Sequence, residues 1–580
     1  NNNIMLVDSL KMIYEFENGV DVIDSLLHPE SLSGKTITLD QRDGLNQLRK
    51  VLLLATASPA EGNIKINTHT VDLRRSFLES LENEDEKESD NATNQYLLFE
   101  FGGIKSVPEN MKSRWQLMKK AVKENNSLRR IKKMISNRKI GSGGSTGSGR
   151  SMLISNHLRS NDAPAEWYSL DRDAQIELAT NHLSWEKLMK WDFDMFEVSK
   201  LSNGRPLLFV GWAILASPHS QYIMEQTLSE GGKKGGSINN DNISSADRKG
   251  YKFLDIYKIP PKCMIDFLRG IEDRYVQDNP YHNNIHAADV LQTTHSFLEE
   301  MGGKYLDNNM KKESSASSTM TLQMFSILVG AAIHDVGHPG YNNAFQSNSF
   351  SQTALTYNDN SVLENFHTSL AFQMILGDNG NSDWNIFQNM EPNDFMKCKR
   401  LITEAILGTD LTFHFSNLEG VKNLVPSASR RDNDNGDNED DYSWKVMSFL
   451  MHMADISNLG KRRAISTQWT DRVLLEFFRQ GDKEKELGLP ISPLCNRDTT
   501  SRPDSQIGFI NYIIRPSFEI LKDHLPLLGT VVLPLVEGNF HFWQLELEVE
   551  NYNNSFSSSE EASSEEEEKE EVVNINIVTS

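Results

Sequence analysis

An apolar stretch that runs directly into a histidine and an aspartate constrains the fold of this chain more than any other feature. Residues Met324–Ile333 are apolar or small and include no proline, which predicts a buried helix. The sequence HDVGHPG follows at 334–340, and its Pro-Gly pair predicts the end of that helix. On the helix, His334 and His338 would share one face. Such groups are typical divalent-metal ligands, although a single His-Asp pair in an apolar helix is more often a hydrogen-bonded part of the core.

Two further segments carry residues of the same chemical type. The sequence YHNNIHAAD at 281–289 spaces His282 and His286 four residues apart, as on one face of a helix. The sequence HMADISN at 452–458 sets Asp455 in an apolar run, and a buried carboxylate is costly unless it is paired or bound to metal. The candidate metal ligands are therefore His286, His334, Asp335 and Asp455, with His282 as a spare imidazole. Three such segments together favour a metal site over a coincidence of core histidines.

Six motifs occur along the chain in a fixed order. They are YHNNIHAAD, HDVGHPG, YNDNSVLENFH, HMADISN, WTDRVLLEFFRQGD and SQIGFINYII. Together with WDFDMF at 191–196, they resemble the catalytic domain of the class I cyclic nucleotide phosphodiesterases over about Trp185 to Leu547. Two positions depart from that family: Gly337 replaces a usual acidic residue, and Phe366 replaces a histidine of many members. Neither position is a metal ligand in the family, so the candidate ligand set stays complete.

The resemblance implies a fold and a metal-dependent chemistry. The fold is an all-α helical catalytic domain of the HD-type metal-dependent phosphohydrolases. Two divalent metals are implied, Zn²⁺ with Mg²⁺ (or Mn²⁺), and the implied ligands of the first are His286, His334, Asp335 and Asp455. Asp335 also reaches the second metal, and water activated between the two metals attacks phosphorus. His282, oriented by Glu476, then protonates the leaving 3′ oxygen.

Other residues enter the site through the same resemblance. Four polar residues match positions that hold ligands and waters, although an ordinary buried hydrogen bond fits each of them equally well: His338, Glu364, His367 and Asp410. In the implied base-binding slot, Gln506 hydrogen-bonds the purine edge while Phe509 and Val473 clamp its faces. Tyr281 and Asn458 line the same pocket.

The predicted function is metal-dependent hydrolysis of a 3′,5′-cyclic nucleotide to the 5′-monophosphate. A glutamine amide can rotate to serve adenine or guanine, so Gln506 alone does not separate cAMP from cGMP. The segments around Asn458, NIFQNMEPNDF and NGRPLLFVG are more similar to the high-affinity cAMP-specific members, which favours cAMP. One alternative is another HD-type nucleotide phosphohydrolase, which the Gln506/Phe509 clamp argues against. The other is a catalytically inactive cyclic-nucleotide-binding scaffold, which the complete ligand set argues against.

Residues 1–125 predict a smaller α/β regulatory module in front of the catalytic domain. The runs KVLLLA at 50–55 and YLLFEF at 96–101 are strand-like. The order of segments resembles a response-regulator receiver domain, with Asp40 as the phosphoacceptor and a phosphorelay donor or a regulatory subunit as partner. A receiver usually holds Mg²⁺ with two adjacent acidic residues, whereas here Asp8 is followed by Ser9. An unidentified regulatory module, or a receiver fold that no longer accepts a phosphoryl group, fits as well.

Composition supplies the remaining expectations. Residues 126–165 predict a basic helix and a Gly/Ser linker, 166–548 the catalytic domain, and 549–580 a disordered acidic Ser/Glu tail. The formal net charge of −22 argues against nucleic acid as a partner. No apolar run approaches the ~20 residues that span a bilayer. Three widely separated cysteines show neither metal spacing nor a disulfide framework, which predicts a reducing compartment such as the cytoplasm.

Overall fold

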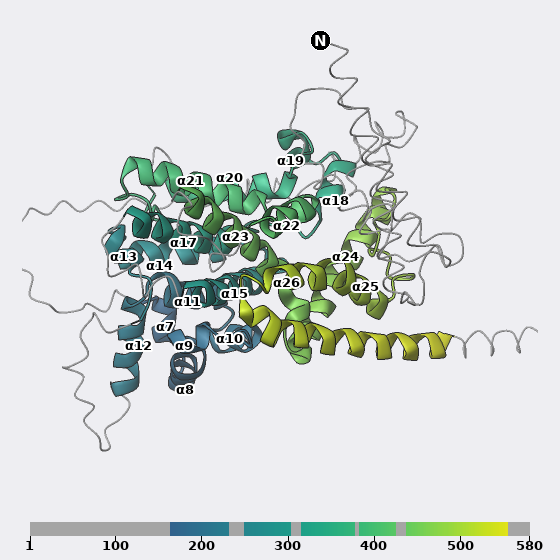
Figure 1. Cartoon of the computed structure of the whole chain (residues 1–580), viewed down its shortest axis with the longest axis horizontal. Helices are drawn as coiled ribbons and strands as arrows, with labels where there is room; N and C mark the ends of the chain where they lie inside the picture. Colours follow the sequence, from purple (N-terminus) through teal and green to yellow (C-terminus); the bar gives the residue numbers. More distant parts are fainter. Residues whose placement is uncertain (1–162, 231–248, 303–314, 378–381, 425–436, 555–580) are drawn as a thin grey trace, which may run out of the picture.

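The part of the chain described by the computed structural model is helical. It comprises residues 163–230, 249–302, 315–377, 382–424 and 437–554, and these ranges contain no β-strand (Figure 1). The predicted all-α catalytic domain is confirmed there. The predicted α/β module at 1–125, with Asp40, lies outside the described residues, as do 555–580 and the linker up to residue 162.

The helices surround a buried centre. Every residue of α11 (Pro206–Leu215) is buried, and proline at its first position suits a helix start because it has no N–H to lose. α11 packs against α14 (Pro261–Glu272) and α15 (Asn284–Gly302). The approach to α14 is close, since a Cβ added at Gly211 would lie 2.5 Å from Leu268. α15 in turn packs against α17 (Ser315–Ile333) and α23 (Asp437–Ile456).

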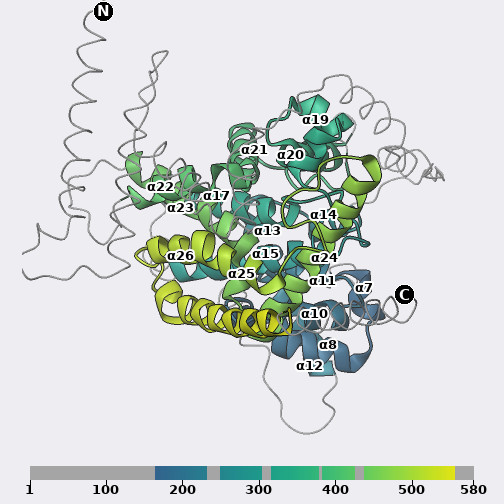
Figure 2. The same ribbon diagram turned by 90° about the vertical axis from the view of Figure 1, so that its right-hand side faces the viewer.

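Further helices enclose this centre (Figures 1 and 2). On its N-terminal side lie α7 (Ala165–Ser169), α8 (Arg172–Glu177), η2 (Leu178–His182), α9 (Trp185–Leu188), α10 (Met195–Leu201), α12 (His219–Glu230) and α13 (Phe253–Ile256). The middle of the chain adds α18 (Asn343–Asn348), α19 (Gln352–Tyr357), α20 (Val362–Leu376), α21 (Pro392–Leu407), η5 (Leu411–Phe413) and α22 (His414–Lys422). The last part adds η7 (Ser457–Gly460), α24 (Arg463–Leu487), α25 (Arg502–Phe509), η8 (Ile510–Ile514), α26 (Arg515–Leu521), η9 (Leu528–Val532) and a helix over 533–554.

The central helices end or begin where the candidate ligands lie. α17 ends at Ile333, and the chain then turns through Gly337, whose φ is +77°. The prediction that His334 and His338 share a helix face is therefore wrong. Glycine is required at this turn, because φ is positive and a Cβ would lie 2.6 Å from Leu370.

The upstream histidine pair also differs from the prediction. α15 begins at Asn284, so His286 lies in its first turn while His282 lies in the preceding turn. The two imidazoles do not share a helix face. Asp455 lies in the last turn of α23, as its apolar surroundings predict.

The C-terminal helix corrects the predicted start of the acidic tail. Residues 549–554 continue the helix that begins at 533, which Figure 1 shows as the yellow helix extending past α25. The Glu550 side chain accepts a hydrogen bond from the Ser501 hydroxyl at 2.8 Å, so this end of the helix contacts α25's N-cap. At the other boundary, Ala163 is already buried and α7 begins one residue before the predicted domain start.

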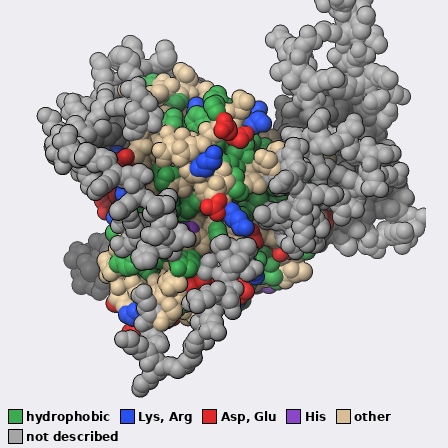
Figure 3. Space-filling model, turned by 90° about the vertical axis from the view of Figure 1, so that its left-hand side faces the viewer, with side chains coloured by type: hydrophobic (Ala, Val, Ile, Leu, Met, Phe, Trp, Pro, Cys, Tyr) green, Lys and Arg blue, Asp and Glu red, His purple; other side chains and the backbone are tan. Residues whose placement is uncertain are grey.

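The surface of the described part is mixed in character. On the face seen in Figure 3, Lys, Arg, Asp and Glu side chains lie close together among apolar ones. Within the described ranges, no helix is both long and apolar enough to cross a membrane.

Candidate active site

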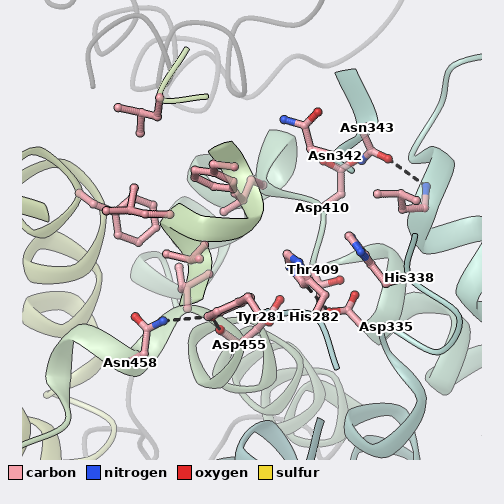
Figure 4. Close-up of a pocket in the computed structure, with 18 of the residues that line it drawn as sticks. Tyr281, His282, Asp335, His338, Asn342, Asn343, Thr409, Asp410, Asp455 and Asn458 are labelled. Carbon is pink, nitrogen blue, oxygen red and sulfur yellow. Dashed lines mark hydrogen bonds and ion pairs between the residues drawn. The ribbon is translucent and has the colours of Figure 1, made fainter. Parts of the chain in front are cut away.

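One open pocket of about 1180 Å³ collects most of the predicted site residues. Its lining includes Tyr281, His282, Asp335, His338, Glu364, His367, Asp410, Asp455, Asn458, Val473, Gln506 and Phe509. Figure 4 shows Tyr281, His282, Asp335 and Asp455 gathered together, with Asn458 to one side. His286, His334 and Glu476 are buried next to these lining residues. The helix ends described above therefore converge on a single cavity.

The four candidate metal ligands form a compact group. Their ligand atoms all lie within 4.8 Å of one another. The His286 Nε2 atom is 2.9 Å from Asp455 Oδ1 and 3.4 Å from His334 Nε2. The Asp335 Oδ2 atom lies 3.3 Å from His334 Nε2 and 3.6 Å from His286 Nε2. Two imidazole nitrogens and two carboxylates facing one point match the donor set that Zn²⁺ accepts.

Hydrogen bonding and charge prepare this group for a cation. The Nδ1–H of His334 donates to the Ala331 carbonyl at 2.9 Å, so in the neutral ring the lone pair of Nε2 faces the group. Although burial opposes protonation, Asp335 and Asp455 raise the pKa of His334 well above its usual value. The same histidine lowers the pKa of both carboxyl groups in spite of their burial. The two carboxylates that favour a proton on His334 also supply negative charge for a divalent metal, whose binding would displace that proton.

His282 and Glu476 form a separate pair. The His282 Nδ1 atom is 2.5 Å from Glu476 Oε1, and Glu476 Oε2 accepts hydrogen bonds from the backbone N–H groups of Tyr281 and His282 at 2.9 and 3.1 Å. Burial disfavours the charged imidazole, but Glu476 and then Asp335 outweigh it and raise the pKa of His282 to about 9. His282 is therefore protonated at neutral pH, and its Nε2 lies 4.0 Å from Asp335 Oδ2. This arrangement suits a general acid.

Two neutral imidazoles stand beside the pair. The His338 ring stacks on His282 with centroids 4.0 Å apart, and burial together with the charge on His282 lowers the pKa of His338 well below its usual value. The Nδ1–H of His367 donates to the Val336 carbonyl at 2.9 Å. Its Nε2 is buried without a hydrogen-bond partner, 3.5 Å from Asp335 Oδ1. In the neutral ring, Nε2 of His367 is therefore a hydrogen-bond acceptor next to the Asp335 carboxylate.

Two further carboxylates line the pocket. Both oxygens of Glu364 accept from the Asn343 amide at 3.1 Å, while burial, and then the charge on Asp410, raise the pKa of Glu364 to about 8. Asp410 accepts a hydrogen bond from the Ser361 hydroxyl at 2.7 Å. Glu364 and Asp410 thus take part in ordinary hydrogen bonds, and both also line the cavity.

The residues predicted to bind the base lie on three elements. Gln506 and Phe509 come from α25, Val473 from α24 and Asn458 from η7. The Gln506 amide is held on both sides, because Oε1 accepts from the Thr470 hydroxyl at 3.0 Å and Nε2 donates to Ser505 Oγ at 3.1 Å. Its orientation is therefore restricted.

Sequence reasoning missed some of these residues. Thr470 precedes Val473 and Glu476 at helical spacing, and that pattern could have indicated it. Asn343 and Thr409 also line the pocket, but Asn343 begins the short helix α18 and Thr409 lies in a turn, and nothing in the local pattern marks either residue.

Comparison with known proteins agrees with this geometry. Residues 281–535 match the family model "3′5′-cyclic nucleotide phosphodiesterase". A dual specificity calcium/calmodulin-dependent 3′,5′-cyclic nucleotide phosphodiesterase 1B from Mus musculus is 37% identical over 306 residues, 52% of this chain and 52% of its own length. A 3′,5′-cyclic-AMP phosphodiesterase 4C from Rattus norvegicus is 32% identical over 381 residues, 65% of this chain and 61% of its own. The chain thus spans about half to three fifths of these curated relatives.

A solved structure supports the fold. The phosphodiesterase domain of Salpingoeca rosetta rhodopsin phosphodiesterase aligns with a TM-score of 0.50 at 24% identity, covering 68% of this chain and 98% of that one. The helical architecture and the His/Asp cluster define an HD-type phosphohydrolase fold. The family match covers residues 281–535, and over this region the chain is similar to 3′,5′-cyclic nucleotide phosphodiesterases.

Proposed function

We propose that this chain hydrolyses 3′,5′-cyclic nucleotides to 5′-monophosphates in a metal-dependent reaction. One observation carries the proposal: the cluster of His286, His334, Asp335 and Asp455 and the His282–Glu476 pair meet at the same pocket that holds Gln506 and Phe509. Hydrolysis of a cyclic phosphodiester that carries a planar base requires three parts: metal ligands, a protonated imidazole and an aromatic slot for the base.

Each part has a distinct role in the proposed reaction. The four-residue cluster holds a divalent metal, proposed to be Zn²⁺, and the Asp335 side of the pocket takes a second, Mg²⁺ or Mn²⁺. Metals bound there supply Lewis acidity for the attack of water on phosphorus. His282 gives its Nε2 proton to the leaving 3′ oxygen, and Glu476 keeps the ring protonated at Nδ1 and correctly oriented. His338, Glu364, His367 and Asp410 bind waters and orient the reacting groups.

We further propose that cAMP is preferred over cGMP. Hydrogen bonds with Thr470 and Ser505 hold the Gln506 amide in one orientation, so the amide presents one pattern of donor and acceptor to the base. A fixed pattern suits one purine edge better than the other. The segments that resemble cAMP-specific members, Asn458 among them, support adenine as that purine. The relatives include one named for cAMP and one named as dual specificity, so this preference needs its own test.

The proposal extends to the organisation of the chain. Residues 166–548, together with the helical continuation to 554, form the catalytic unit. Residues 1–125 form a regulatory module. It is regulated by a phosphorelay donor that phosphorylates Asp40, or by a regulatory subunit that binds it. Residues 126–165 connect the two parts, and the acidic tail follows the last helix.

Rates of cAMP and cGMP hydrolysis by the full chain, before and after chelation, test the function directly. We expect turnover of cAMP at lower substrate concentration than cGMP, loss of both rates on chelation, and recovery when Zn²⁺ and Mg²⁺ are restored. Turnover that is unaffected by chelation would contradict the metal-dependent reaction. Metal that is bound without any turnover would instead favour a nucleotide-binding scaffold.

A further inference from the structure

Three consecutive backbone carbonyls just after Asn458 are capped by side chains from distant parts of the chain. The Asn539 amide nitrogen donates to the carbonyls of Leu459 and Lys461, each at 2.8 Å. The Trp191 Nε1–H donates to the carbonyl between them, that of Gly460, also at 2.8 Å. The end of a helical turn leaves carbonyls without intrahelical partners, and here all three receive side-chain donors.

The capping groups are deeply buried. Asn539 and Trp191 are each only 3% exposed, and Asn539 uses both of its amide hydrogens on this turn. The turn also has no space to shift, because a Cβ added at Gly460 would lie 2.9 Å from Val532 and 3.3 Å from the Trp191 ring. A buried amide that loses its acceptors carries a desolvation cost, so the donors and the turn hold each other in place.

The exit of the turn is anchored to the helix that carries His286. Lys461 is fully buried, and its Nζ donates to Thr293 Oγ1 at 2.8 Å and lies 4.0 Å from Asp289 Oδ1, both on α15. The same ammonium group stands 4.5 Å from the centroid of the Trp191 ring. Trp191 therefore caps the turn through its N–H and covers Lys461 through its face.

The residue held by this arrangement faces the base-binding pocket. Asn458 lies in η7, one residue before the capped carbonyls, and its amide donates to the Tyr281 hydroxyl at 3.0 Å. Both side chains line the pocket. We propose that Asn539 and Trp191 are positioning residues that fix Asn458 against the substrate and so set nucleotide affinity and the choice between cAMP and cGMP. This inference rests on the proposed function of the pocket.

The physical argument separates binding from the chemical step. Asn458 lies on the wall of the pocket, and the hydrogen bonds of Asn539 and Trp191 go to the carbonyls at 459–461 rather than to His282 or Asp335. Releasing the turn should therefore raise KM while leaving kcat nearly unchanged. The loss of one buried hydrogen bond from the turn corresponds to at most about a fivefold change in affinity, and the loss of two to at most about thirtyfold.

Two independent variants test the inference in the full chain. Asn539→Leu keeps the size of the side chain but removes both donors, and Trp191→Phe removes the indole N–H while keeping an aromatic ring. The matched control is Gln175→Ala, which removes another buried amide that donates to a backbone carbonyl, that of Trp167, on elements outside the pocket. Because KM does not depend on the fraction of folded enzyme, a general loss of stability would lower the apparent kcat instead.

We expect Asn539→Leu to raise KM for the preferred nucleotide by about tenfold and Trp191→Phe to raise it by up to about fivefold. Both should keep kcat within about twofold and change the cAMP/cGMP ratio of kcat/KM. The control should leave KM and the ratio unchanged. Wild-type values of KM and of the ratio in Asn539→Leu and Trp191→Phe would overturn the inference. If the wild-type chain hydrolysed neither nucleotide, the proposed function would be wrong. The positioning role could then still be tested by cAMP binding, and equal cAMP dissociation constants in wild type and variants would overturn it.

Discussion

Replacing Glu476 by glutamine probes the protonation of His282. The carboxylate touches the imidazole at 2.5 Å and is 3% exposed, so solvent screens it little. Against the opposing effect of burial, it is the main cause that raises the pKa of His282 from 6.5 to about 9. A difference of that size corresponds to about 3 kcal/mol in favour of the protonated ring.

The glutamine variant should reverse this preference. Its amide oxygen can still accept from the backbone N–H groups of Tyr281 and His282, which leaves the amide NH₂ facing Nδ1. Both the loss of charge and this new donor disfavour a proton on Nδ1, so the pKa of His282 should fall toward its ordinary value of 6.5, although Asp335 still favours the charged ring. At that ordinary value, about a tenth of the rings would be protonated near pH 7.5, so kcat should fall by up to about tenfold.

The pH dependence of kcat is the decisive assay. In wild type, the alkaline limb should lie near the His282 pKa of about 9, and in Glu476→Gln it should move toward 6.5, with activity recovering as the pH falls. Glu484→Gln is the matched control, since Glu484 is a buried carboxylate on the same helix whose oxygens accept hydrogen bonds from Ser492 at 2.6 Å. An alkaline limb that stays near pH 9 in Glu476→Gln, or a loss of kcat equal at every pH, would refute the reasoning.

Three further predictions concern the metal, the stability and the N-terminal module. His334→Ala should lower the metal content measured by mass spectrometry, because it removes a donor at the centre of the cluster; wild-type content would contradict the ligand assignment. Burial raises the pKa of Glu272 from 4.5 to about 7, so the protonated carboxyl stabilises the folded state below pH 4.5, and this stabilisation is lost as the pH rises through 7. Between acidic pH and pH 8, the free energy of unfolding in urea should therefore fall by up to about 3 kcal/mol more in wild type than in Glu272→Gln. Parallel pH profiles of the two proteins would contradict this prediction. If 1–125 is a working receiver, a small phosphodonor should change the hydrolysis rate of wild type but not of Asp40→Ala, and the same response in both would exclude Asp40.

The sequence by itself determined the type of fold and predicted the candidate site residues. The apolar run at 324–333 and the carboxylate set in the apolar run around Asp455 are local signals, because burial of a polar group is visible from its neighbours along the chain. The order of the six motifs then identified the family, and the residues they contain lie around one cavity or directly behind it.

Helix boundaries depended on tertiary packing. The predicted shared faces of His282 with His286 and of His334 with His338 were wrong, since α15 begins after His282 and α17 ends before His334. The positive φ at Gly337 follows from the close approach of Leu370, a residue far away along the chain. The C-terminal helix likewise continues past the predicted start of the tail, to a point where Glu550 reaches Ser501.

Only the tertiary structure decided the pKa values of the site residues and the contacts that hold the turn after Asn458. The pKa of His282 depends on Glu476, which lies 194 residues further along the chain, and no local pattern relates the two positions. The amide of Asn539 and the indole of Trp191 meet one turn from opposite ends of the domain. A short-range sequence pattern predicts which residues are buried. Which other residues they contact depends on the packing of the whole chain.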